Sequence, residues 1–321
     1  MIPTADYVEF LDAEYLRSYV AHGGAAVKFV VPSDDAEALM LSTGVEAAAS
    51  VAGYEIVRVD AAEVRIHLMD QVFFAIAQQI DWLGLARRAV NAAFAALAYP
   101  TDEFDTTGDG CTIGTVAARY EVDPLELTRD VNRQLQATVY RDYAMVGEFR
   151  TAMLRLCQAQ LGSGQVTEAE SVAVLDWLGG NLRQMSSLRS ALIFRRIGRH
   201  NARPMLFSLA HWLTANGQAG LLVVLDVRRL GFSRRPSPSE RQGLYYTKAA
   251  LLDAYELLRQ LVDNTDELTK CCVLVMAVPE FIFDPIRGID AYQALKLRIF
   301  DEVRDRRRDN PFSSLVRVGQ V

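Results

Sequence analysis

The sequence lacks the short motifs that mark common catalytic and metal-binding sites. Its four cysteines show no CxxC spacing, its four histidines show no HxxxH spacing, and there is no GxSxG nucleophile motif. Without these patterns, the sequence predicts neither a zinc site nor a serine or cysteine hydrolase site. Cys271 and Cys272 lie within an apolar run. We expect the cysteines to be buried free thiols in a reducing compartment.

Long apolar runs and a targeting signal are missing as well. The acidic N-terminus has no charged region followed by an apolar stretch. The most apolar long segment, residues 72–99, is broken by Asp81, Arg87 and Arg88. We therefore expect no signal peptide and no membrane span, and we expect a cytoplasmic protein.

Neither sign of charge is strongly in excess. The 321 residues include 40 Asp and Glu against 34 Lys and Arg, which gives a net charge of −6. This balance excludes nucleic-acid binding through bulk charge, so any such contact requires a local basic patch. Half of the residues are hydrophobic, which is ordinary for a globular chain with a substantial core.

Strand and helix patterns alternate near both ends of the chain. Short apolar runs predict five buried strands, at residues 26–31, 54–61, 220–226, 271–279 and 313–321. Helical patterns lie before and between them, at residues 4–22, 35–52, 246–263 and 291–306. Apolar strands that alternate with helices predict an α/β fold, with a mostly parallel five-stranded sheet and helices on both faces. The first two strands and their helix form a βαβ unit with a right-handed crossover.

The middle of the chain, residues 71–219, shows no convincing strand pattern and is predicted to be a long helical insertion between the second and third strands. We therefore divide the chain into an α/β core, residues 1–98 and 215–321, and an insertion, residues 99–214. Within the insertion, residues 112–135 predict two helices joined by a short turn. That spacing is compatible with a DNA-binding helix-turn-helix, and also with an ordinary pair of packed helices, which is the commoner arrangement.

The turn after the first strand stands where a nucleotide-binding protein has its phosphate loop, GxxxxGK[ST]. Such a loop holds phosphates through converging backbone N–H groups, glycine geometry and a lysine charge. Pro32 stands at the first glycine, Glu37 at the second, Ala38 at the lysine and Leu39 at the hydroxyl residue. The degenerate loop comprises Pro32, Ser33, Asp34, Asp35, Ala36, Glu37, Ala38 and Leu39. Because the proline removes a donor and the acids repel a triphosphate, we expect no ordinary ATP hydrolysis.

The third predicted strand ends like the metal-binding strand of an ATPase. The run "GLLVVLD" places Asp226 at the carboxyl end of an apolar strand, where open α/β sheets bind ligands. In an active ATPase a glutamate that polarises the attacking water usually follows, and here the next residue is Val227. Asp226 and Val227 therefore keep only half of that acidic pair.

With these motifs in place, the sequence resembles the P-loop, AAA-like ATP-binding proteins of BREX-type phage-defence systems. The similar stretches are "EYLRSYVAHGGAAVKFVV", "GYEIVRVDAAEVRIH", "RRIGRHNARPMLFSLAHWLTANGQAGLLVVLD", "YELLRQLVDNTDELTKCCVLVMAVPEFI" and "YQALKLRIFDEVRDRRRDNPFSSLVRV". The resemblance implies a P-loop or AAA-like sheet, a glycine-rich loop with a lysine, and an acidic pair after the third strand. The chain departs from the family at both motifs, and we expect no helical lid after its last strand. We therefore expect a pseudo-ATPase that binds neither ATP nor magnesium.

Arginines gather in three places along the chain, at residues 195–203, 226–241 and 304–311. Guanidinium groups suit phosphate and carboxylate recognition, so these clusters predict contacts with DNA or with a protein partner. The candidates are Arg195, Arg196, Arg199, Arg203, Arg228, Arg229, Arg234, Arg235, Arg304, Arg306, Arg307 and Arg308. Ion pairs within the chain are the alternative, because acids outnumber bases. Few aromatic residues interleave with the arginines, which disfavours the stacking of single-stranded bases.

Three functions remain compatible with the sequence. The first is a non-catalytic scaffold or regulator in an antiphage-defence or DNA-processing complex, with a protein partner such as a helicase or an active ATPase paralogue. The second is a direct DNA-binding component that uses the arginine clusters. The third is a residual nucleotide-binding NTPase built around Asp226. A homo-oligomer is compatible with each of them.

Overall fold

The computed structural model describes residues 1–101, 111–232, 243–300 and 309–320. The chain forms two compact units: unit 1, residues 1–76 and 213–321, and unit 2, residues 77–212. The units reflect how densely residues contact one another, whereas a domain is defined by its ability to fold alone. The domain bounds expected from the sequence, 98/99 and 214/215, therefore stay a prediction.

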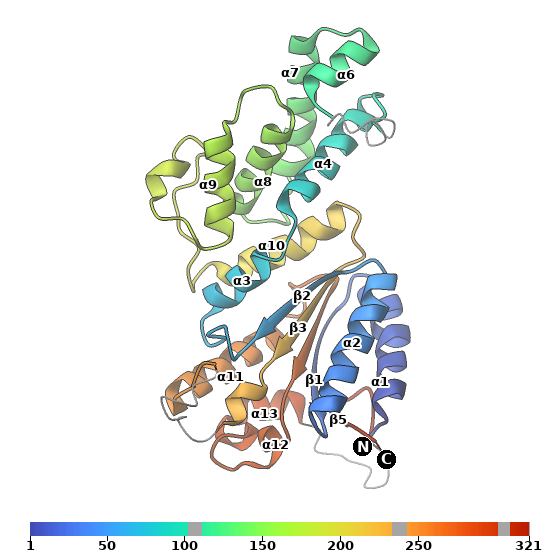
Figure 1. Ribbon diagram of the computed structural model, residues 1–321, viewed down its shortest axis with the longest axis vertical. Helices are drawn as coiled ribbons and strands as arrows, with labels where there is room; N and C mark the ends of the chain where they lie inside the picture. Colours follow the sequence, from blue (N-terminus) through green and yellow to red (C-terminus); the bar gives the residue numbers. More distant parts are fainter. Residues whose placement is uncertain (102–110, 233–242, 301–308, 321) are drawn as a thin grey trace. The chain divides into compact units, whose positions relative to one another are not determined.

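Unit 1 contains a sheet of five parallel strands, as the sequence predicts. The strands are β1 (Ala25–Pro32), β2 (Glu55–Asp60), β3 (Leu221–Asp226), β4 (Cys271–Met276) and β5 (Leu315–Val318). Their order is β2-β3-β4-β1-β5, and every neighbouring pair is parallel. The consecutive strands β1 and β2 are therefore separated by β3 and β4 (Figure 1). The carboxyl ends of all five strands lie at one edge of the sheet.

Helices cover both faces of this sheet (Figure 1). One face carries α1 (Thr4–Phe10), its π-helical continuation η1 (Leu11–Val20), and α2 (Asp35–Val51). The opposite face carries α11 (Lys248–Asp263), α12 (Glu280–Phe283) and α13 (Gln293–Ile299). Three further short helices belong to unit 1 in whole or in part: α3 (Met69–Ala77), η4 (Arg228–Gly231) and η5 (Ile289–Ala291).

The core of unit 1 follows from the two-residue period of its strands, whose side chains point alternately to the two faces. On the α1/α2 face the buried cluster comprises Tyr7, Leu11, Leu16, Val20, Ala26, Val30, Leu41, Val45, Ala49, Tyr54, Leu222, Val224, Cys272, Leu274, Met276, Val316 and Val318. On the other face the Phe29 ring lies 6.0 Å from that of Phe281, which lies 5.6 Å from Tyr255 of α11. Because both faces are covered, all eight residues of β1 are buried, which explains why seven of them are apolar. The exception is Lys28, whose Nζ donates to the carbonyls of Phe312 and Ser313 at 2.8 and 3.1 Å.

Among the residues of unit 2 that the structure describes, the regular elements are helices and no strand is formed, which confirms the predicted helical insertion between the second and third strands. Its helices are α4 (Trp82–Ala96), α6 (Ile113–Tyr120), α7 (Pro124–Leu135) with the π-helical η2 (Gln136–Tyr140), α8 (Gly147–Gln160), α9 (Glu168–Leu178), η3 (Met185–Leu188) and α10 (Ala202–Ala215). Helix α4 packs against α7 and α8. The Trp82 ring on α4 lies 6.0 Å from Phe149 on α8.

Helices α6 and α7 form the pair that the sequence predicts over residues 112–135. Glu121 ends α6 in a left-handed conformation (φ 55°). Asp123 caps α7, where its carboxylate accepts the N–H groups of Leu125 (2.7 Å) and Glu126 (3.0 Å). The arrangement is a helix pair with a short turn, and its use in DNA binding stays a prediction.

The four cysteines are free and buried, as predicted. Burial raises the pKa of Cys157 and of Cys272 to about 12, so these thiols are poor nucleophiles at neutral pH. Among the helices that the structure describes, none combines the length and the apolar character that a bilayer crossing requires.

Candidate functional site

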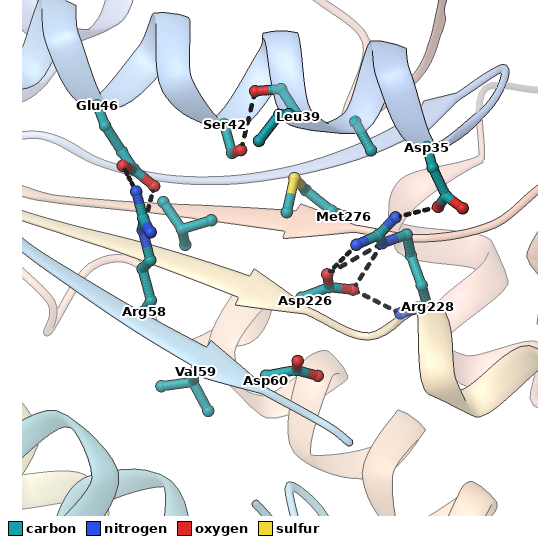
Figure 2. Close-up of a pocket in the computed structure, with 12 residues that line it drawn as sticks. Asp35, Leu39, Ser42, Glu46, Arg58, Val59, Asp60, Asp226, Arg228 and Met276 are labelled. Carbon is teal, nitrogen blue, oxygen red and sulfur yellow. Dashed lines mark hydrogen bonds and ion pairs between the residues drawn. The ribbon is translucent and has the colours of Figure 1, made fainter. Parts of the chain in front are cut away.

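Two aspartates end neighbouring strands at the carboxyl edge of the sheet. Asp60 is the last residue of β2 and Asp226 is the last residue of β3, and the strand register pairs them with each other. A backbone hydrogen bond joins the two strand ends, because the N–H of Ala61 donates to the Asp226 carbonyl at 2.9 Å. Met276 ends β4 at the same level. The edge therefore presents two adjacent carboxylates, as Figure 2 shows.

The Asp226 carboxylate is held by an arginine of its own turn (Figure 2). Nε of Arg228 donates to the two carboxylate oxygens at 3.1 and 3.0 Å, and Nη2 donates to Oδ2 at 2.7 Å. The backbone N–H of Arg228 adds a bond of 3.0 Å to Oδ1. Bidentate pairs of this kind are among the stronger hydrogen bonds in proteins. The Asp226 side chain is only 16% exposed, so the pair is partly shielded from water.

The same guanidinium also reaches the first residue of α2. Nη1 of Arg228 lies 2.6 Å from Oδ1 of Asp35, so one side chain bridges the end of β3 and the start of α2. Hydrogen bonding to Asp226 is the main cause that raises the pKa of Arg228, and the charges of Asp35 and Asp60 add to it. The Asp35 side chain is 99% exposed, so water screens this second pair and makes it the weaker one. We call this arrangement the Arg228 bridge.

The N-terminus of α2 is closed by a carboxylate of the chain itself. Oδ1 of Asp34, the N-cap residue, accepts the N–H of Glu37 at 2.9 Å, and the Ser33 hydroxyl donates to Oδ2 at 3.2 Å. The bond from the Glu37 N–H is the main cause that lowers the pKa of Asp34. An N-cap of this kind occupies a backbone donor that a phosphate bound at a helix N-terminus would use.

Strand β1 and helix α2 are joined almost directly. Pro32 ends β1 and pairs with Val318 of β5, and α2 begins at Asp35, so only Ser33 and Asp34 lie between them. The N–H of Ser33 is itself bonded to the Val318 carbonyl at 2.9 Å. A phosphate loop needs a longer turn, whose N–H groups converge on the phosphate.

The remaining residues of the predicted degenerate loop belong to the first turns of α2. Glu37 is buried, and its carboxylate accepts the hydroxyl of the equally buried Thr4 on α1. Ala36 is exposed, Ala38 is buried, and Leu39 is exposed. Hydrocarbon side chains thus stand at the positions of the lysine and the hydroxyl residue in a phosphate loop.

Two cavities open at this edge of unit 1, and both are lined by the Arg228 bridge and by Asp60. The first, of about 450 Å³, lies beneath α2, where Arg58 forms a bidentate ion pair with Glu46 (Figure 2). The second, of about 840 Å³, is richer in acids. Its carboxylates are Asp35, Asp60, Glu63, Asp226, Glu280 and Asp284, and its cationic groups are Arg228 and Arg229. This excess of carboxylates makes the second cavity unfavourable for a polyanion.

The residues on either side of Arg228 are fixed within the fold. Nε of Arg229 donates to the Leu244 carbonyl at 2.6 Å, and its guanidinium lies 4.5 Å from the ring centre of Phe232. Val227 is buried. Both arginines of this turn therefore have partners inside the chain.

The arginines that the sequence singles out fall in different parts of the molecule. Arg195, Arg196, Arg199 and Arg203 belong to unit 2, and Arg228 and Arg229 belong to unit 1. Six others lie outside the described residues: Arg234, Arg235, Arg304, Arg306, Arg307 and Arg308. Contacts of these arginines with DNA or a partner stay a prediction.

Sequence reasoning missed the pairing of Arg228 with Asp226 and the second carboxylate at the edge, Asp60. The signal for Asp60 is present, because β2 ends on an acid in the same way as β3. The signal for the bridge is weaker. The spacing Asp226-Val227-Arg228 allows an ion pair within a turn, but only the sheet order brings Asp35 to the same place.

These features define an α/β protein with a five-stranded parallel sheet, and the two aspartates lie at the carboxyl edge, where open sheets of this class bind their ligands. A family model described as BREX system ATP-binding protein BrxC/D matches residues 114–320, and the chain belongs to that family, as its resemblance implied. The match includes β3, β4 and β5 and begins after the degenerate loop. No curated protein and no solved structure matches the chain.

Proposed function

We propose that this chain is a non-catalytic, pseudo-ATPase subunit in BREX phage defence, where it serves as a scaffold or regulator. Membership of the BREX family supports the role in defence. The observation that carries the non-catalytic part is the Arg228 bridge, in which one guanidinium binds the carboxylates of both Asp226 and Asp35.

The residues at the strand edge do not fit a magnesium–triphosphate group. Magnesium prefers free carboxylate oxygens, but both oxygens of Asp226 accept hydrogen bonds from Arg228. Triphosphate needs free backbone donors and positive charge, but Asp34 caps α2 and acids line the second cavity. Each feature opposes nucleotide binding for a separate physical reason.

A scaffold needs only a folded surface, and the chain retains a complete sheet with both faces covered. Its partner in this proposal is another protein of the same defence system, such as an active ATPase paralogue or a helicase. The family is described as ATP-binding. This chain would then supply the family fold without the nucleotide chemistry, alone or as a homo-oligomer.

Thermal unfolding with and without 1 mM magnesium–ATP tests the proposal directly. A site with a dissociation constant of about 10 μM, at roughly 100-fold ligand excess, would add about 2.7 kcal/mol of stability. For a chain of this size that gain corresponds to a melting shift of a few degrees. We expect no shift for the wild type, and none for Asp226→Asn.

Arg17→Ala is the matched control, because it breaks an exposed arginine–carboxylate pair, with Asp12 on η1, away from the strand edge. A magnesium–ATP shift in the wild type and in Arg17→Ala that disappears in Asp226→Asn would overturn the proposal. That result, together with ATP hydrolysis that needs Asp226, would establish the residual NTPase instead.

A further inference from the structure

One stretch of unit 2 is strongly basic within an acidic chain. Residues 177–212 contain six arginines and no aspartate or glutamate. The whole chain has 40 acids in 321 residues, so a stretch of this length would carry four or five of them at the average density. Local excess of one charge sign is the electrostatic footprint of a surface that binds the opposite charge.

Buried anchors fix the irregular part of this stretch, residues 179–201, in place. Ile193 and Ile197 are buried, so the residues between them are held at the surface. The Trp177 indole donates to the carbonyl of Arg195 at 2.9 Å, and Arg155 of α8 donates to the carbonyl of Ser190 at 2.8 Å. The segment is therefore ordered, although only η3 within it is helical.

Five arginines of the stretch are exposed, and we call them the arginine surface: Arg183, Arg189, Arg195, Arg196 and Arg199. A bond of 2.8 Å from Nη2 of Arg196 to the carbonyl of Arg183 brings residues from the two ends of the segment together. Arg195 has one carboxylate partner, Glu148, at 3.6 Å, and its side chain remains 75% exposed. In the part of the chain that the structure describes, no ion pair is formed by Arg189 or Arg199.

An aromatic side chain lies among these arginines. Phe194 is 69% exposed, and it directly precedes Arg195 and Arg196. Buried Ile193 holds the backbone beneath it, so the ring stays on the solvent side. A fixed, exposed ring within a basic patch is the combination on which unpaired bases stack while arginines contact the phosphates.

We propose that the arginine surface with Phe194 binds single-stranded nucleic acid. The irregular part of the stretch also favours a single strand over a duplex, because its one short helix, η3, has only four residues and it has no strand to insert into a groove. The sequence disfavoured stacking because few aromatics interleave with the arginines. The structure shows that Phe194, which precedes Arg195 and Arg196, is held in an exposed position. This inference is independent of the strand-edge site and of its nucleotide chemistry.

The test is fluorescence anisotropy of the full chain with a labelled, unstructured 20-nucleotide DNA and with the same sequence as a duplex. We expect the single strand to bind more tightly and the binding to weaken with salt. Phe194→Ala should weaken single-strand binding about fivefold or more, which is the effect of losing one stacked base. The double variant Arg189→Gln/Arg199→Gln should reduce the slope of log K against log salt by about 1.4, for two lost phosphate contacts.

Two controls match these changes outside the arginine surface. Phe283→Ala on α12 removes a phenylalanine of similar exposure, 65%, and Arg87→Gln on α4 removes an exposed arginine. Neither should change the affinity. Equal melting temperatures will show that all variants are folded.

Three results would overturn the proposal. The first is no binding of either DNA at low salt. The second is duplex binding as tight as single-strand binding with no effect of Phe194→Ala, which would indicate phosphate contacts alone. The third is binding of an acidic peptide such as polyglutamate without binding of DNA, which would make the surface a docking site for an acidic protein.

Discussion

The two units of this chain differ in how they distribute charge. Unit 1 has 20 basic and 26 acidic residues, so it carries the whole net charge of −6. It also contains all four lysines of the chain. Unit 2 has 14 arginines, no lysine and 14 acidic residues, so its net charge is zero. The neutral unit nevertheless contains the strongest local excess of positive charge, because its acids lie outside residues 177–212. Net charge therefore does not locate a binding surface, whereas the spacing of the charges does.

The ion-pair partners of individual arginines also differ between the two units. Arg228 in unit 1 is bound by two carboxylates of the chain and is 31% exposed. Arg199 in unit 2 is exposed, and the described residues give it no ion pair. We infer that the first arginine stabilises the fold and that the second is free to bind a ligand.

The largest expected effect tests whether the units are energetically separate. Leu274 on β4 and Leu156 on α8 are both fully buried, one in each unit. Either Leu→Ala change should lower the free energy of unfolding by about 2–5 kcal/mol, because it leaves a cavity. Differential scanning calorimetry should show two transitions, with Leu274→Ala lowering one and Leu156→Ala the other.

An equal displacement of a single transition by both variants would contradict that separation. The chain would then unfold as one cooperative body, and differences between the units would be differences of surface only. The exposed variant Leu125→Ala on α7, where the side chain is 77% exposed, is the control for the loss of a leucine without a cavity.

A smaller effect separates the structural arginine from the free one. Arg228→Ala leaves the partly buried Asp226 carboxylate beside Asp60 without its partner, so we expect a loss of about 1–2 kcal/mol in stability. Arg199→Ala should change stability by less than about 0.5 kcal/mol, because Arg199 is exposed and forms no ion pair with the residues that the structure describes. Urea unfolding of the two variants measures both values. Equal losses would remove the distinction between the two arginines.

The architecture could be predicted from the sequence because its signals are local. All five strands are rich in apolar residues, of which β3 and β4 are the least interrupted, and all five form the sheet. The strand order is not a local property. The first two strands read as a βαβ unit, but β3 and β4 lie between them in the sheet. Only long-range packing decides that order.

The strand-edge site could be predicted only in part for the same reason. The sequence of residues 32–39 shows directly that the glycines and the lysine of a phosphate loop are absent. The Arg228 bridge needs Asp35 and Asp226, 191 positions apart, to meet at one edge. The exposure of Phe194 likewise depends on which of its neighbours are buried.

The smallest expected effect is the contribution of one carboxyl group to the pH dependence of the stability of unit 1. Glu256 on α11 accepts hydrogen bonds from Arg259, Tyr292 and Gln260, of which Arg259 contributes most, and these lower the pKa of its carboxyl to about 2. A carboxyl whose pKa is lower in the folded state stabilises the fold above its unfolded value, and this stability is lost as pH falls through the folded value. The loss should therefore occur between about pH 4.5 and pH 2.

The Glu256 side chain is 34% exposed, so solvent screening reduces the expected contribution to about 1 kcal/mol. Glu256→Gln should lower the melting temperature of the unit 1 transition at pH 7 and flatten its fall between pH 4.5 and pH 2. Glu9→Gln, at an exposed position of α1, keeps the Glu256 cluster and should follow the wild-type curve. The unit 2 transition should be unaffected by either change. If Glu256→Gln shifted both transitions equally, the two units would share their electrostatic stability, and the contrast between them would apply to ligand binding alone.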